Sequence, residues 1–169
     1  MAFLLIINFP LNTSKKIAFA LFLFIAGFTL EWVGVHYEFL FGSYTYGNNL
    51  GVKVDGIPLL IGVNWAVLIL SSGAISELIT KNKVVKVLFG ALLMVFLDFF
   101  IEVPAPHFDY WSFEGGTAPL QNFIAWYLIS AFLLSIMEIL KIKGDSIFSC
   151  HLYAAQLVFF AFFYGTYTL

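Results

Sequence analysis

Three carboxylic acids, Glu31, Asp98 and Glu102, lie within or at the end of apolar segments long enough to cross a lipid bilayer. An ionised carboxylate in a membrane interior is costly, so such residues usually have a functional role or a polar partner. Asp98 and Glu102 are four residues apart and therefore project from one face of a helix. Two carboxyl groups in a low-dielectric environment tend to share one proton, which leaves one of them as a poised acid. The pattern predicts acid–base chemistry inside a membrane.

The composition indicates what kind of protein positions these acids. Of the 169 residues, 62% are hydrophobic and 11% are charged, and the mean hydropathy is +0.96. A soluble globular domain carries about 25% charged residues. A transmembrane helix needs about 20 apolar residues, and five windows have that length: Ile17–Tyr37, Pro58–Ile79, Val84–Val103, Pro119–Leu140 and Ile147–Thr168. We therefore expect an all-α integral membrane bundle that forms one polytopic domain over residues 1–169.

The lysines predict how this bundle is oriented. Seven of the eight lie just before the first window or in the two clusters Lys81 to Lys86 and Lys141 to Lys143 at and beside the short turns, and only Lys53 lies in a long connection. Cytoplasmic loops carry the excess of basic residues, so we expect a multi-pass protein of a bacterial or archaeal cell membrane with its C-terminus outside. The net charge of −2 offers no basic surface for nucleic acid. The apolar segment Met1–Leu11 is too short to span and lacks the basic start of a signal peptide, so we expect an interfacial segment or the remainder of a longer helix.

The two long connections, residues 38–57 and 104–118, are rich in glycine and aromatic residues, and loops of this length are usually functional. Each contains an aromatic-x-aromatic motif and ends near a proline that is followed, seven residues on, by a tryptophan: Tyr44-Thr45-Tyr46, Pro58 and Trp65, then Trp111-Ser112-Phe113, Pro119 and Trp126. Glu31 precedes the first set and Asp98 precedes the second. This order suggests two related halves, residues 17–79 and 84–140, with a final helix at 147–168; chance assembly in an aromatic-rich chain is the alternative. Such halves commonly enclose a site at their interface.

Helix geometry predicts the depth of the acids. Glu31 lies about 21 Å beyond Ile17, and Asp98 lies the same distance beyond Val84, so both fall in the outer half of the membrane together with His36 and the long loops. A purely structural, hydrogen-bonding role is the alternative for Glu31 and Asp98, and a solvated position at the interfacial end of its helix is the alternative for Glu102. Glu77 and Glu138 lie at the opposite helix ends beside lysines, where we expect ordinary ion pairing.

Several chemistries lack their sequence signatures. Three histidines are too few for the iron sites of membrane desaturases and no Glu-x-x-His pair marks a metal-binding bundle, so we expect no metal. The chain has no P-loop and no Gly-x-Gly-x-x-Gly turn, and no Gly-x-Ser-x-Gly elbow. The remaining interpretation is acid chemistry in an aromatic-lined cavity that takes a hydrophobic substrate from the bilayer.

As an ordered set, these motifs resemble the membrane-integral carotenoid 1,2-hydratases of the bisanhydrobacterioruberin and gamma-carotene hydratase type. The likeness covers most of the chain and rests on these segments: Glu31-x-x-Gly34, Phe41-Gly42-Ser43-Tyr44-Thr45-Tyr46, Gly56-Ile57-Pro58, Trp65, Asp98, Trp111-Ser112-Phe113, Pro119-Leu120-Gln121-Asn122-Phe123 and Trp126. The chain departs from that pattern at Glu102-Val103-Pro104, where the family is expected to have Asp-Pro, and at Ala118 and Ala125, where glycine is expected. These differences bear on the substrate more than on the chemistry.

The resemblance implies addition of water to the terminal 1,2 double bond of an acyclic carotenoid, without an organic cofactor. The expected partners are this lipophilic substrate, membrane lipid and other enzymes of carotenoid synthesis. Our mechanistic hypothesis makes Asp98 the acid and Glu31 the base, with Glu102 and His36 beside them, and the exchanged assignment is the alternative. The expected substrate-binding residues are Tyr44, Tyr46, Trp65, Trp111, Phe113, Asn122 and Trp126. The competing functions are an isomerase or cyclase that uses the same protonation, and a transporter or assembly partner that is not an enzyme.

Overall fold

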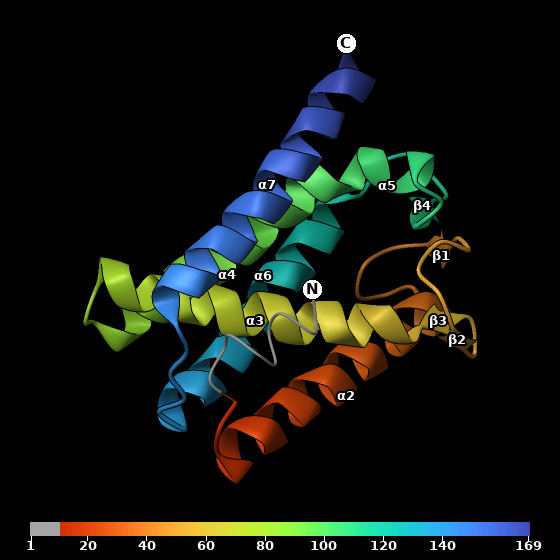
Figure 1. Cartoon of the computed structure of the whole chain (residues 1–169). Coiled ribbons are helices and arrows are strands. Elements are labelled where there is room, and N and C mark those ends of the chain that lie inside the picture. Colours follow the sequence, from red (N-terminus) through yellow and green to blue (C-terminus); the bar gives the residue numbers. More distant parts are fainter. Residues whose placement is uncertain (1–10) are drawn as a thin grey trace.

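The computed structural model describes residues 11–169 and contains five long apolar helices (Figure 1). They are α2 (Ser14–Tyr37), α3 (Leu59–Ile79), α4 (Lys83–Glu102), α6 (Leu120–Ile139) and α7 (Ser146–Thr168), and each is long and apolar enough to cross a membrane. The predicted five-helix bundle is confirmed, with every helix beginning within three residues of its predicted start. The expectation for Met1–Leu11 concerns residues 1–10, which lie outside the described part of the chain.

Local sequence signals explain where the helices begin. At one end of the bundle, the side chains of Thr13, Asn82 and Asp145 accept hydrogen bonds from backbone N–H groups in the first turns of α2, α4 and α7, which satisfies donors that the helix itself leaves unpaired. At the other end, α3 and α6 begin directly after Pro58 and Pro119. Proline has no N–H to satisfy and its fixed φ suits a helix start, so both prolines open helices as the sequence predicts.

Two helical hairpins and one additional helix form the bundle. Helix α2 packs along α3, and α4 packs along α6, while α3 also contacts α4, α6 and α7. Helix α3 is the central element, since 78% of its most apolar window is buried inside the protein. A Cβ atom on Gly62 would lie 2.7 Å from the carbonyl oxygen of Phe24, so glycine allows α2 and α3 to approach each other closely. Small residues at such contacts are typical of helix packing in membranes.

The two long connections meet at one end of the bundle (Figure 1). They contain the strands β1 (Tyr44–Tyr46), β2 (Lys53–Val54), β3 (Ile57–Pro58) and β4 (Trp111–Phe113), and the short helix α5 (Pro104–His107). Strands β1 and β4 pair antiparallel, with Tyr44 opposite Phe113 and Tyr46 opposite Trp111. The sequence predicts these motifs only as loops. Their pairing joins the two connections into one cap over the helix ends.

At the opposite end of the bundle, the two glutamates expected to pair with lysines do so. The ammonium group of Lys86 on α4 forms ion pairs with Glu77 on α3 and with Glu138 on α6. Lys143 lies 3.8 Å from the second carboxylate oxygen of Glu77. This ion-paired end of the bundle is the one that the lysine distribution assigns to the cytoplasm, and that assignment stays a prediction.

Candidate active site

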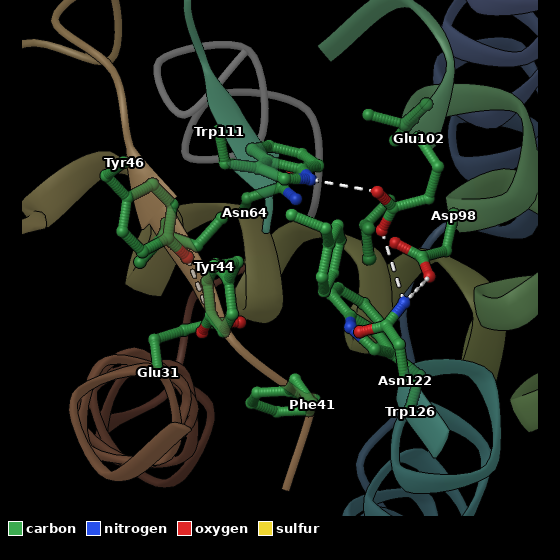
Figure 2. Close-up of a pocket in the computed structure, with 14 residues that line it drawn as sticks. Glu31, Phe41, Tyr44, Tyr46, Asn64, Asp98, Glu102, Trp111, Asn122 and Trp126 are labelled. Atoms are coloured by element: carbon green, nitrogen blue, oxygen red, sulfur yellow. Dashed lines mark hydrogen bonds between the residues drawn. The ribbon is translucent and has the colours of Figure 1, made fainter. Parts of the chain in front are cut away.

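A small chamber lies beneath the paired strands, where α2, α3, α4 and α6 converge (Figure 2). It has room of about 20 Å³, which accommodates one water molecule. Figure 2 shows Glu31 with Tyr44 and Tyr46 on one side, and Asp98 with Glu102 and Asn122 on the other. The lining residues are Glu31, Phe41, Tyr44, Tyr46, Ile61, Asn64, Leu68, Asp98, Ile101, Glu102, Trp111, Phe113, Asn122 and Trp126.

Glu31 accepts three hydrogen bonds from neutral donors. Its Oε2 atom accepts from the hydroxyls of Tyr44 and Tyr46, each at 2.6 Å, and its Oε1 atom accepts from Trp65 Nε1 at 2.7 Å. Burial, followed by the negative charge of Glu31, raises the pKa of Tyr44 and of Tyr46 above the usual tyrosine value. Both phenols therefore keep their protons at physiological pH. A carboxylate only accepts hydrogen bonds, so this set of donors suits Glu31 in its charged form.

Two glycines on α2 allow the donors to reach Glu31. A Cβ atom on Gly27, one turn before Glu31, would collide with the side chain of Trp65. A Cβ atom on Gly34, nearly one turn after it, would lie 2.9 Å from the Tyr44 hydroxyl oxygen. The Glu31-x-x-Gly34 motif thus has a direct structural explanation, because glycine at these positions leaves space for the side chains that hold the acid.

Asp98 and Glu102 form the opposite wall and share one amide. Asn122 Nδ2 donates to Asp98 Oδ2 at 3.0 Å and to Glu102 Oε1 at 3.2 Å, and Trp111 Nε1 donates to Glu102 Oε2 at 3.0 Å. Asp98 is 2% exposed, and its second oxygen, Oδ1, has no hydrogen-bond partner among residues 11–169. The expectation that the two acids share a helix face is confirmed. Asp98 therefore retains one oxygen that is free to act on a ligand.

Aromatic rings surround the acids. The indoles of Trp65 and Trp126, one from each helical hairpin, stack with centroids 4.1 Å apart and planes 16° from parallel. Across the strand pair, the centroids of Tyr44 and Phe113 lie 5.3 Å apart, and Tyr46 meets Trp111 edge to face. The faces of such rings carry partial negative charge. The rings can therefore stabilise a cation in the chamber in addition to the carboxyl groups.

Within the described part of the chain, the acids of the chamber have no cationic partner. No lysine is among the lining residues, and the ion pairs formed within residues 11–169 involve neither Glu31, Asp98 nor Glu102. Within the same range, no group of three His, Cys, Asp or Glu side chains is arranged to hold a metal ion. The acids therefore interact with hydroxyl, indole and amide donors instead of a fixed charge.

The structure brings together all but one of the residues predicted for the site. Nine of the eleven line the chamber, and Trp65 joins them through its hydrogen bond to Glu31. His36 does not reach the chamber, because its ring faces Asp55, with Nε2 3.3 Å from Oδ2, and its Nδ1 lies 2.8 Å from the backbone oxygen of Trp32. We therefore leave His36 out of the candidate site.

Some lining residues are absent from the predicted set. Asn64 is polar and lies in the chamber wall with Ile61 and Leu68. These three positions are three and four residues apart, so they share one face of α3. That spacing, together with Trp65 beside Asn64, is the sequence signal from which the contribution of α3 to the chamber wall could be predicted. Phe41 and Ile101 complete the apolar part of the wall.

Comparison with known proteins gives a match to one protein family. No curated protein and no solved structure matches the chain. A family model described as carotenoid biosynthesis protein matches residues 1–169, the full length of the sequence. Carotenoids are apolar polyenes that reside in membranes, and a bundle with five candidate membrane spans gives their synthesis a suitable setting. The chain belongs to the carotenoid biosynthesis protein family.

Proposed function

We propose that the protein is a carotenoid hydratase that adds water to the terminal 1,2 double bond of an acyclic carotenoid. One observation carries this proposal: acids from two helical hairpins share a chamber with room for one water, and they are held differently. Glu31 has three donors on its two oxygens, whereas Asp98 has one donor and a free oxygen. Hydration needs these two groups, because one proton must be delivered and another must be removed.

In the first step, the protonated carboxyl group of Asp98 gives its proton to C2 of the double bond. The π electrons form the new C2–H bond and leave a tertiary carbocation at C1. The rings of Tyr44, Trp111 and Phe113 stabilise this cation through their electron-rich faces, by about 2 kcal/mol for a well-placed, desolvated ring. The Asn122 amide, which donates to Asp98, stabilises the carboxylate that remains.

In the second step, the water in the chamber attacks C1. A lone pair of the water forms the C1–O bond, and Glu31 accepts the proton that the water loses, so the product is a tertiary alcohol. Transfer of this proton from Glu31 back to Asp98, through a following water, restores both groups. The sum is one water added per double bond with no change in oxidation state, and this sequence of steps requires no organic cofactor.

The hydrogen bonds favour this assignment over the exchanged one. Three donors on Glu31 stabilise a negative charge there and oppose its protonation in the resting state. Asp98 lies next to Glu102 with a single shared amide between them, and two neighbouring acids of this kind retain one proton between them. We therefore assign the acid role to Asp98 and the base role to Glu31.

Expression in cells that accumulate lycopene tests the proposal. Extracted pigments are separated and their masses are measured. The proposal expects new pigments heavier than lycopene by one or two molecules of water. A new pigment with the mass of lycopene would indicate an isomerase or cyclase instead, and unchanged lycopene in the presence of folded, membrane-inserted protein would contradict the proposal for this substrate.

A further inference from the structure

A second, larger cavity lies beside the chamber. Its volume is about 250 Å³, close to the lower limit of about 300 Å³ for typical small-molecule sites. Helix α3 forms one wall through Leu60, Val63 and Val67, and α7 forms another through Gln156 and Phe160. Leu50 and the Tyr110–Trp111 segment, from the two long connections, also line it. We call this cavity the α3–α7 groove.

The groove and the chamber share a wall. Ile61, Asn64, Ile101 and Trp111 line both. Trp111 also donates a hydrogen bond to Glu102 inside the chamber, so one side chain contacts an acid and borders the groove. A ligand in the groove would therefore have one end within the reach of the acids, with only this shared wall to displace.

The chemistry of the groove differs from that of the chamber. Apart from the amides of Asn64 and Gln156, the residues among 11–169 that line it have aliphatic or aromatic side chains, and none of them is charged. Leu60, on its rim, is 50% exposed on a helix that is a candidate membrane span, so the groove adjoins a surface that faces lipid. This combination suits a hydrocarbon chain that enters from the bilayer.

The chamber is too small to hold more than a water molecule in the present conformation. A carotenoid is a long chain of which only the end group reacts, so most of the molecule must lie elsewhere. We propose that the α3–α7 groove binds the polyene chain of the substrate and delivers its end group to Asp98 once the side chains of the shared wall have moved aside. This inference rests on the proposed function for the identity of the ligand, but its binding test does not depend on turnover.

The first test measures occupancy. The native thiol is removed with Cys150→Ser, and a single cysteine is placed at Val63, which lines the groove and not the chamber. The matched control is Val158→Cys on α7, where valine is 69% exposed. In detergent, pre-incubation with lycopene is expected to slow labelling of position 63 by an apolar maleimide at least tenfold, and to leave position 158 within twofold. Equal labelling rates at position 63 with and without lycopene would overturn the inference.

A phospholipid acyl chain is the competing occupant. Phosphatidylcholine added without lycopene is therefore included as a separate sample. If it protects position 63 as strongly as lycopene does, the groove is a lipid site and the inference fails.

The second test measures turnover. Val63→Trp fills the groove without touching the acids, and it is expected to lower lycopene conversion at least tenfold, while Val158→Trp stays within twofold of the parent. Conversion at the parent rate by membrane-inserted Val63→Trp protein would contradict the inference. If lycopene protects position 63 but the protein converts no carotenoid, the groove still binds the polyene and the proposed hydratase function is wrong. Failure of the binding inference is thus distinguishable from failure of the proposed function.

Discussion

The two ends of the bundle each contain a cluster of carboxylates, and the clusters are held in opposite ways. At one end, Glu77 and Glu138 surround the ammonium group of Lys86. At the other end, Glu31 and the Asp98–Glu102 pair interact with phenol, indole and amide donors, and no lysine lines their chamber. The first cluster is electrically compensated within the fold, whereas the second retains acids whose protons can move.

This difference separates a structural role from a chemical one. A lysine beside a glutamate keeps both groups charged, so neither exchanges a proton readily near neutral pH. Neutral donors hold an acid in position without cancelling its charge. Binding of a ligand, or gain or loss of a proton, therefore changes the free energy of that acid strongly. We therefore expect substitutions in the chamber to act mainly on turnover, and substitutions in the lysine cluster to act mainly on stability.

The largest expected effect on turnover is that of Asp98→Asn. Asparagine retains the size of the side chain and its contact with Asn122, but it cannot deliver a proton to carbon. General acid catalysis contributes about 10²–10⁴-fold in rate, so we expect carotenoid conversion to fall at least a hundredfold, measured as product per amount of membrane-inserted protein. Asp145→Asn is the matched control, because asparagine also caps the start of α7. An equal loss of conversion in Asp98→Asn and Asp145→Asn would indicate that the effect comes from folding and not from the missing acid.

Glu31→Gln is expected to have the next largest effect, about a hundredfold in conversion rate. The amide of glutamine cannot accept a proton from the attacking water, and its NH₂ group would face one of the donors that now point at Glu31. The control is Glu114→Gln in the loop after β4, where the same chemical change lies outside the chamber. Retention of more than half of the parent rate by Glu31→Gln would remove Glu31 from the mechanism.

Gly27→Ala is expected to lower the conversion rate about tenfold. The added methyl group collides with Trp65, so the indole must move away from Glu31 and the stack with Trp126 is disturbed. Overpacking of this kind costs about 1–3 kcal/mol of stability, which thermal unfolding in detergent measures. Gly165→Ala on α7 is the matched control, since a methyl group there meets nothing within 4 Å. If the two variants behave alike, close approach at Gly27 is not required.

Lys86→Met is expected to have the smallest effect on turnover and a clear effect on stability. It leaves Glu138 without the cation it pairs with and Glu77 with only the more distant Lys143, and breaking a buried ion pair in this way costs about 3 kcal/mol. We expect a lower unfolding temperature, together with a conversion rate per folded protein within twofold of the parent. The triple variant with Glu77→Gln and Glu138→Gln should recover much of the lost stability. A large loss of turnover in folded Lys86→Met protein would contradict the division of roles between the two clusters.

The sequence predicts the helices and the position of the acids because both depend on local properties. Membrane-spanning helices follow from runs of apolar residues, and the shared face of Asp98 and Glu102 follows from a spacing of four. The position of His36 also follows from helix geometry, although the prediction placed it at the site. It lies five residues after Glu31, which turns its side chain about 140° away around the helix axis, toward Asp55.

The contacts between distant segments could not be predicted in the same way. The pairing of β1 with β4 joins residues more than sixty positions apart, and no periodicity in either loop specifies its partner. The hydrogen bond from Trp65 to Glu31 depends on how closely α2 approaches α3, which Gly27 permits and the hydrophobic pattern does not reveal. The α3–α7 groove likewise arises from the packing of the final helix against α3.

The most direct test of the central claim uses purified protein and lycopene in D₂O enriched in heavy oxygen. If Asp98 protonates C2 and water captures the cation, each hydrated end group gains one carbon-bound deuterium and one heavy oxygen, and mass spectrometry detects both after exchangeable deuterium has been washed out. The account predicts equal incorporation of the two labels, and loss of both in Asp98→Asn. Carbon-bound deuterium without heavy oxygen, or equal labelling by the Asp98→Asn variant and the parent protein, would contradict it.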